Sequence, residues 1–145
     1  MFKLQSNGPK IYAALKKKLD VLANTDRITR QAAFDSAALI QARVQQRGQA
    51  VEGALKPYAP STMKQRRKAG RQTGYKDLTF RGDLFRNWAV SPVGKTGYAV
   101  GFLAKRSGDI ARYQEAREGV IFELRRNELQ TVQEAIENQV KEILT

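Results

Sequence analysis

The sequence predicts an α+β fold in which helices pack on a small antiparallel sheet. Apolar residues recur at helical spacing near both ends of the chain. The middle holds two short apolar segments that are separated by a turn bounded by glycines. The 145 residues suit one domain. We therefore expect a single domain over 1–145, from which a long, extended basic segment, 53–79, protrudes as an arm.

Two helices are expected in the N-terminal part. The first opens at Gly8-Pro9, because proline favours the first helical position, and its apolar residues continue at helical spacing to Ala23. Residues 24–26 predict a break and an N-cap. A longer helix follows over about 27–50, and its narrow stripe is rich in alanine, which lets another element approach closely.

A basic segment without acidic residues spans 53–76 and holds seven lysines and arginines. Pro57 and Pro60 predict an extended piece, followed by a short helix that Ser61 or Thr62 caps and Gly70 ends. Three interpretations stay open: a phosphate-binding surface, with bases stacked on Tyr58 or Tyr75, a solvated mobile loop, or an interface with acidic neighbours. The arm residues that we expect to contact a partner are Lys56, Pro57, Tyr58, Pro60, Lys64, Arg66, Arg67, Lys68, Arg71 and Lys76.

An aromatic-rich cluster and a hairpin come next. A short helix is expected over 80–87, followed by strands over 88–93 and 98–103 that flank a turn. Pro92 predicts that the first strand is an edge strand or contains a bulge. The hairpin strands are expected to join neighbouring subunits through Val90, Val93, Val100 and Phe102. The expected core residues are Leu84, Phe85, Trp88, Ile136 and Val140.

The C-terminal part is expected to hold a helix, a strand and a final amphipathic helix. Residues 107–109 cap the first helix, which runs to about Ala116 with Ile110 and Tyr113 facing inward. A strand or an extended piece over 120–124 precedes the last helix, which Asn127 caps with Gln130 in the capping-box position. The apolar stripe of this last helix is the cleanest in the chain.

The composition excludes several kinds of chemistry. The chain has no cysteine and no histidine, so Ser-His and Cys-His catalysis and Cys/His zinc sites are impossible. Two-carboxylate and Ser-Lys chemistry is left open by the composition, but the carboxylates are scattered and no spacing pairs two of them at one site. We therefore expect no enzyme, no cofactor and no metal. No apolar run approaches the roughly 20 residues that cross a bilayer, and the N-terminus lacks the apolar core of a signal peptide, so a membrane partner is not expected.

The formal net charge of +12 predicts a polyanionic partner or an acidic protein surface. The charge is uneven, because residues 1–108 hold 21 basic and 6 acidic side chains, whereas 109–145 hold 5 basic and 8 acidic ones. Opposite charge on two parts of one chain suits head-to-tail packing between copies. A solvated basic surface is the alternative.

Several segments occur in the order found in one family. Residues 57–62 with Lys64, followed by 78–84, resemble the Pro-Leu-Ser-Pro-Ser-Thr and Leu-Thr-Gly segments of phage virion morphogenesis and tail-completion proteins of the Mu-like type. The Val100-Gly101 step, 110–116 and 120–124 are similar to later elements of that family. Arg81 and Gln114 stand where the family has threonine and histidine.

This resemblance implies a structural protein of the virion, assembled in the cytoplasm of the bacterial host. Such a protein lies in the neck, at the head-proximal end of the tail, as a ring commonly of six copies. The ring closes the tail tube and docks it to the neck around the DNA channel. The implied partners are further copies of the chain, neck or connector proteins, tail tube or sheath proteins, and DNA through non-specific contact. The alternative is a small basic nucleic-acid-binding protein.

Overall fold

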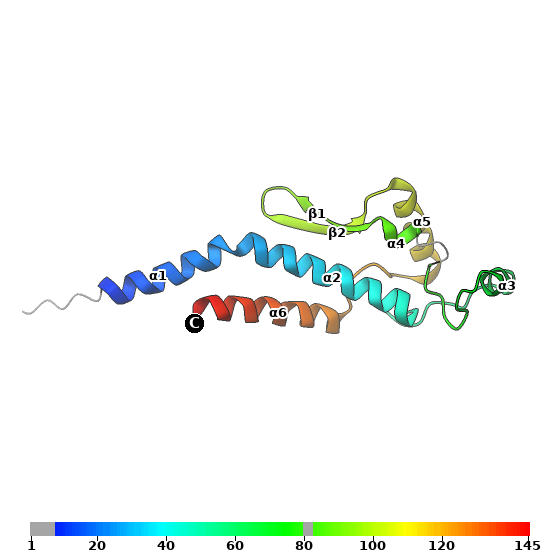
Figure 1. Cartoon of the computed structure of the whole chain (residues 1–145), viewed down its shortest axis with the longest axis horizontal. Coiled ribbons are helices and arrows are strands. Elements are labelled where there is room, and N and C mark those ends of the chain that lie inside the picture. The colour runs from blue at the N-terminus through cyan, green and yellow to red at the C-terminus, as the bar shows by residue number, and fades with distance from the viewer. Residues whose placement is uncertain (1–7, 80–82) are drawn as a thin grey trace, which may run out of the picture.

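The computed structural model describes residues 8–79 and 83–145, which form six helices and two strands (Figure 1). The elements are α1 (Gly8–Ala23), α2 (Thr25–Arg47), α3 (Pro60–Lys68), α4 (Asp83–Arg86), β1 (Trp88–Val93), β2 (Gly97–Phe102), α5 (Lys105–Glu118) and α6 (Arg126–Leu144). Helices packed on a small antiparallel sheet confirm the α+β class.

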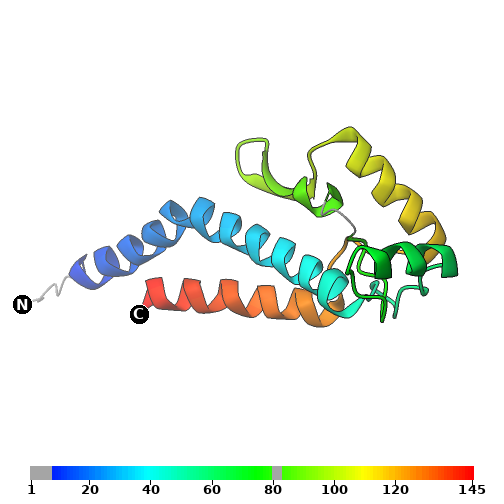
Figure 2. The same ribbon diagram turned by 45° about the vertical axis from the view of Figure 1, so that its right-hand side comes forward.

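Helix α2 is the central element of the fold. The hairpin packs on one side of α2 and α6 on another, while α1 continues beyond one end (Figure 1). Figure 2 shows α3 and α5 gathered at the opposite end. The buried apolar face of α2 is formed by Ile28, Ala37, Ile40 and Val44. The indole of Trp88 donates to the Ala37 carbonyl at 3.0 Å, a close approach that the small alanine side chain allows.

The first two helices meet at Asn24, where the predicted break occurs. Helix α2 begins at Thr25 and ends at Arg47, slightly earlier at both ends than predicted. It ends because Gly48 adopts φ +61° and its amide bonds the Val44 carbonyl at 2.9 Å. A side chain at Gly48 would also meet the Tyr75 ring, since a Cβ there would lie 2.7 Å from Tyr75 Cδ2.

The hairpin confirms the predicted pair of strands. Its register places Trp88 opposite Phe102 and Val93 opposite Gly97. Four aromatic rings gather between the hairpin and α4, with centroids 4.9 to 6.3 Å apart: Phe85, Trp88, Phe102 and Phe122. Leu84 and Phe85 are buried and Trp88 is partly buried, as core residues are expected to be. Phe122 is a member that the sequence did not predict.

Helix α5 differs from its prediction. It begins at Lys105 after the extended residue Ala104, so Ser107 lies inside the helix and accepts a bond from Asn87 Nδ2 at 3.1 Å. The expectation that Ile110 and Tyr113 face inward is wrong, since they are 39% and 60% exposed. Ala111 faces the core instead, because α5 starts earlier and packs through its small residues.

Residues 120–124 form no strand, so the first of the two predicted alternatives is wrong. The backbone of this segment bonds side chains: the amides of Ile121 and Phe122 both donate to Glu115 Oε1 at 3.0 Å. Helix α6 then starts at Arg126 rather than at a cap on Asn127. Glu128 closes its first turn, since its Oε1 accepts from the Arg125 amide at 2.8 Å. The capping-box position is therefore Glu128, not Gln130.

The apolar stripe of α6 is less buried than predicted. Val132 is buried, whereas Ile136 and Val140 are only partly buried and Leu129 is 45% exposed. The reason is that α6 forms an outer layer, which α2 covers along its length and α1 covers in part. The predicted helix over 80–87 is represented by α4, and residues 80–82 lie outside the described ranges.

Candidate functional site

The basic arm is folded around Arg66. This arginine is 2% exposed, and its Nε donates to the Gln72 carbonyl at 2.9 Å while Nη1 donates to the Thr79 carbonyl at 2.5 Å. Its Nη2 lies 3.2 Å from Asp77 Oδ1. Its Cζ stacks 4.4 Å from the centroid of the Tyr58 ring. These contacts tie the C-terminal end of α3 to the segment that follows it.

Tyr58 contacts the same group of residues as Arg66 does. Its hydroxyl donates to Asp77 Oδ1 at 2.8 Å and accepts the amides of Asp77 and Leu78 at 3.2 Å each. Burial, and then the Asp77 carboxylate, raise the pKa of Tyr58 to about 12. Tyr75 donates its hydroxyl to the Gln45 carbonyl at 3.1 Å. One face of the Tyr58 ring carries Arg66, so that face is closed to a stacking base.

Glu118 fastens the arm to α5. Its carboxylate accepts Lys76 Nζ at 2.7 Å and the Lys56 amide at 2.9 Å, and Lys56 Nζ reaches the Arg117 carbonyl at 3.2 Å. Burial acts to raise the pKa of Glu118, but the hydrogen bonds from Lys56 and Lys76 outweigh it and lower the pKa below its usual range. A cavity of about 370 Å³ lies beside this contact, lined by Tyr58, Gln114 and neighbours.

These contacts correct the predicted set of partner-binding residues. Arg66 and Lys76 are buried at 2% and 8% exposure, because Asp77 and Glu118 pair with them inside the chain. Other cations of the arm face solvent. We call four of them, on α3 and the turn after it, the α3 basic face: Lys64, Arg67, Lys68 and Arg71. Lys56, Pro57 and Pro60 are also exposed.

The hairpin presents a partly open surface. Val93 is 56% exposed near the turn, while Val90 and Val100 are half-buried. Phe102 belongs to the aromatic cluster, so its side chain is used within the fold rather than at the predicted interface. In the described part of the chain the sheet has two strands, so each strand has an outer edge without a strand partner.

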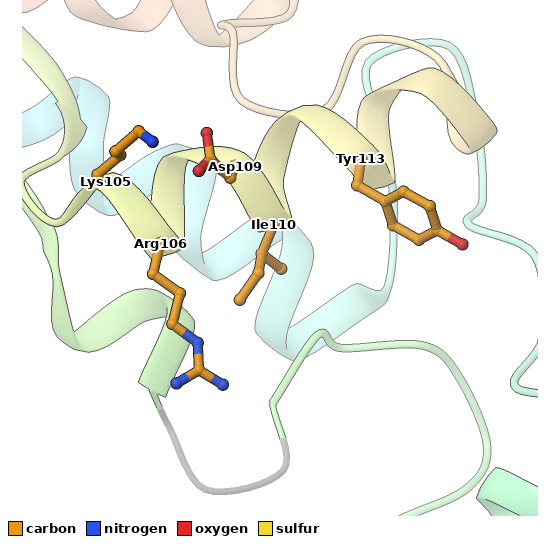
Figure 3. Close-up of a pocket in the computed structure, with 5 residues that line it drawn as sticks. All are labelled: Lys105, Arg106, Asp109, Ile110 and Tyr113. Atoms are coloured by element: carbon orange, nitrogen blue, oxygen red, sulfur yellow. The ribbon is translucent and has the colours of Figure 1, made fainter.

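The outer face of α5 forms a shallow hollow. Figure 3 shows its five lining side chains, which are Lys105, Arg106, Asp109, Ile110 and Tyr113. Asp109 is bonded to Arg112 at 2.9 Å. Among the residues that the structure describes, no group of three or more carboxylates could hold a metal ion. The hollow therefore offers a mixed surface for contact and carries no visible catalytic pairing.

Helix α1 carries a surface that the sequence did not reveal as such. Five of its large apolar residues are 54–69% exposed: Ile11, Tyr12, Leu15, Leu19 and Leu22. We call these five the α1 stripe. The helical spacing of the stripe is clear in the sequence, but periodicity alone does not show whether a stripe is covered.

The chain exposes an unusually large area. Its accessible surface is 10650 Å², whereas a monomeric protein of 16.3 kDa exposes about 7,500 Å². Ten residues of an unfolded chain expose about 1,600 Å², so the ten residues outside the described ranges account for no more than that part of the difference. Roughly 1,600 Å² of excess surface therefore belongs to the described elements, which extend along one axis with little mutual cover.

Comparison with models of known protein families finds no match for this sequence, and searches of curated proteins and of solved structures find no significant similarity. Over 8–79 and 83–145, no helix has both the length and the hydropathy needed to cross a bilayer.

Proposed function

We propose that this chain is a structural subunit of a tailed bacteriophage virion. In this proposal, copies of the chain form a ring at the head–tail junction, around the DNA channel. The ring completes or terminates the tail and docks it to the neck. The order of the sequence segments supports the phage context. The proposal includes no catalytic role.

The single observation that carries the assembly role is the excess surface. A standard protein–protein interface buries about 800 Å² on each partner, so an excess of roughly 1,600 Å² corresponds to two such contacts per copy. A subunit that contacts two neighbours through different surfaces builds a ring when the rotation closes. The exposed α1 stripe and the open hairpin lie on different elements, as two such contacts require.

The hairpin supplies one of the two contacts between neighbouring copies. A two-stranded sheet is marginally stable by itself, and an exposed sheet edge pairs readily with a strand of another chain. Pro92 lies in β1, where it limits pairing at one position, and Val93 stands exposed beside it. We propose that strand pairing across this edge joins neighbouring subunits.

The α3 basic face supplies contacts outside the ring. Within the described residues, none of its four cations has an ion pair, so their charge is available to a partner. In the proposal this face meets acidic surfaces of neck, connector, tail tube or sheath proteins, or the DNA in the channel. The ion pairs of Arg66 and Lys76 hold the face at one end of the molecule (Figure 2).

Particle imaging tests the proposal directly. We expect the purified chain to form a closed ring by light scattering and negative-stain electron microscopy. We also expect a labelled antibody to mark the head–tail junction of virions. A chain that stays monomeric at every concentration and is absent from particles would refute the proposal.

A nucleic-acid-binding protein is the second candidate, and the α3 basic face is the observation that favours it. Four phosphate contacts predict that log K falls with log salt at a slope of about −3.6 on duplex DNA. Replacing Arg67 and Lys68 with glutamine should reduce that slope by about 2. Replacing Arg27 and Arg30, exposed cations of α2, is the matched control. Fluorescence anisotropy that is flat in salt would reject this candidate.

A further inference from the structure

We propose that α1 is the element that connects copies of this chain, by packing its stripe against the acidic outer face of α6 in a second copy. The lysines of α1 then lie against the glutamates of that neighbouring α6. This inference rests on the proposed function of the chain as an assembly subunit, and it names the contact that builds the assembly.

The α1 stripe has the spacing of a helix–helix seam. Tyr12, Leu15, Leu19 and Leu22 follow each other at intervals of three, four and three residues, as the a and d positions of a heptad do. A helix of 16 residues is only marginally stable without tertiary packing. Within the described part of the chain, α2 and α6 contact α1 but leave each stripe residue more than half exposed.

The charged residues beside this seam indicate which kind of helix can pack against it. Lys16 and Lys18 occupy the e and g positions beside it, and Lys10 and Lys17 are exposed on the same helix. Two α1 helices packed on each other would oppose these lysines, which disfavours that pairing. The seam therefore requires a partner helix with an acidic surface.

Helix α6 provides such a surface on a second copy. Glu134, Glu137 and Glu142 are exposed and outnumber the one lysine exposed among them, Lys141. Leu129 and Leu144, near the two ends of the helix, are 45% and 41% exposed. Helix α1 contacts α6 in its own chain and continues past its C-terminal end (Figure 1), and Glu134, Glu137 and Glu142 stay exposed beside this contact. A contact between α1 of one copy and α6 of the next joins two different surfaces, which is the arrangement that propagates into a ring or a filament.

The total exposed area of the chain is compatible with a contact of ordinary size. A stable interface needs about 800 Å² from each partner, and the excess surface of the described elements is roughly twice that. The remaining excess is left for the hairpin edge or for the proteins that flank the ring.

A charge exchange between chains tests the contact. One variant carries Lys16→Glu, Lys17→Glu and Lys18→Glu, and the other carries Glu134→Lys, Glu137→Lys and Glu142→Lys. Each variant alone should show at least a tenfold weaker association by analytical ultracentrifugation, because like charges then face each other. An equimolar mixture should recover the mass of the wild-type assembly, since every α1 again meets an α6 of opposite charge. A change confined to one chain cannot produce this rescue.

A second pair of variants tests the apolar part of the seam. Leu15→Gln combined with Leu19→Gln should abolish the larger species while the circular dichroism spectrum keeps its helical signal, since both side chains are more than half exposed. Leu103→Gln is the matched control, because Leu103 is 67% exposed and lies outside both helices. The control should assemble like the wild type.

The outcomes separate this contact from the proposed function. If the wild type assembles and the α1 variants assemble equally well, the contact is refuted and the assembly role stands. If the wild type is monomeric throughout, the contact is refuted, and the assembly role falls as well if the chain is also absent from particles. Sedimentation with vesicles of phosphatidylserine and phosphatidylcholine tests the other occupant of a basic apolar helix. Binding that depends on Leu15 and Leu19 in a chain that does not self-associate would assign α1 to a lipid surface and overturn the proposal.

Discussion

Arg66 and Asp77 form a buried ion pair, with Nη2 of the arginine 3.2 Å from Oδ1 of the aspartate, at the C-terminal end of α3. Their side chains are 2% and 11% exposed. The pair joins residues that are 11 positions apart and closes the arm into a folded unit. As a consequence, α3 is held in place by tertiary contacts, and so are the residues of the α3 basic face.

Replacing Arg66 with glutamine should loosen the arm. Breaking a buried ion pair leaves the other charge uncompensated, which costs about 3–5 kcal/mol. We expect faster hydrogen exchange of the α3 amides and a lower urea midpoint. Arg67→Gln is the control, because Arg67 is the exposed neighbour, and its effect should stay within about 0.5 kcal/mol. Equal effects of the two substitutions would contradict a structural role for Arg66.

Arg43 should be a second point on which stability depends. Its guanidinium bonds the Glu128 carboxylate and the carbonyls of Ile121 and Glu123, and so joins α2, α6 and the 120–124 segment. Burial lowers the pKa of Arg43 although Glu128 acts to raise it.

We expect Arg43→Met to lower the free energy of unfolding by about 3–5 kcal/mol, since Glu128 is then buried without its partner. Adding Glu128→Gln should recover part of the loss, which a double-mutant cycle by urea denaturation measures. Arg47→Met, on the exposed face of the same helix, should change stability little. A fully additive double variant would show that the two residues do not act as a pair.

Glu118 should make stability depend on pH. Its pKa is lower in the folded chain than the value of about 4.3 for an unperturbed glutamate. The unfolded chain therefore takes up the proton first as the pH falls, so the stabilisation is present above about pH 4.3 and disappears as the pH falls through the folded pKa. The groups that donate to this carboxylate are the Lys56 amide at 2.9 Å and Lys76 Nζ at 2.7 Å.

The measurement compares Glu118→Gln with the wild type by urea denaturation between pH 3 and pH 7, a range that brackets about 4.3. The wild type should be the more stable near neutral pH, and the difference should shrink in acid. Glu52→Gln, which changes an exposed glutamate, is the control. A difference that stays constant from neutral pH into acid would exclude Glu118 as the source.

The open edge of the hairpin should be sensitive to charge. Lysine on an edge strand opposes pairing with another strand, and Val93 is 56% exposed, so Val93→Lys should leave the fold intact. We expect a lower assembled mass by light scattering. Thr96→Lys adds the same charge in the turn beside the strand and should assemble normally. Unchanged assembly of Val93→Lys would remove the hairpin edge from the interface.

Local patterns explain which elements could be predicted. The α1 and α6 stripes have helical period, and the hairpin has a glycine-bounded turn between two apolar segments, so these elements appear close to where they are expected. The segment 120–124 has the composition of a strand, but Arg43 and Glu115 bond its backbone instead. Those partners lie far away in the sequence or on another element, so tertiary contacts overrode local propensity.

The candidate site was predicted less completely, for a related reason. The cations of the arm are visible in the sequence, whereas the partners that remove Arg66 and Lys76 from the surface are not. Glu118 is 42 residues from Lys76, and one acidic residue looks like another until the chain is folded. Phe122 also packs in the aromatic cluster, although it lies outside the sequence segment from which that cluster was predicted.

The sequence by itself determined the fold class, the placement of the main helices and the hairpin, and the absence of histidine and cysteine chemistry. These depend on composition and on contacts between residues near each other in the chain. Only the tertiary structure decided which cations are free and which apolar stripe is left open. Burial and charge pairing are properties of surfaces that distant segments create together, so α1 and α6 carry the same kind of pattern but are covered to different extents.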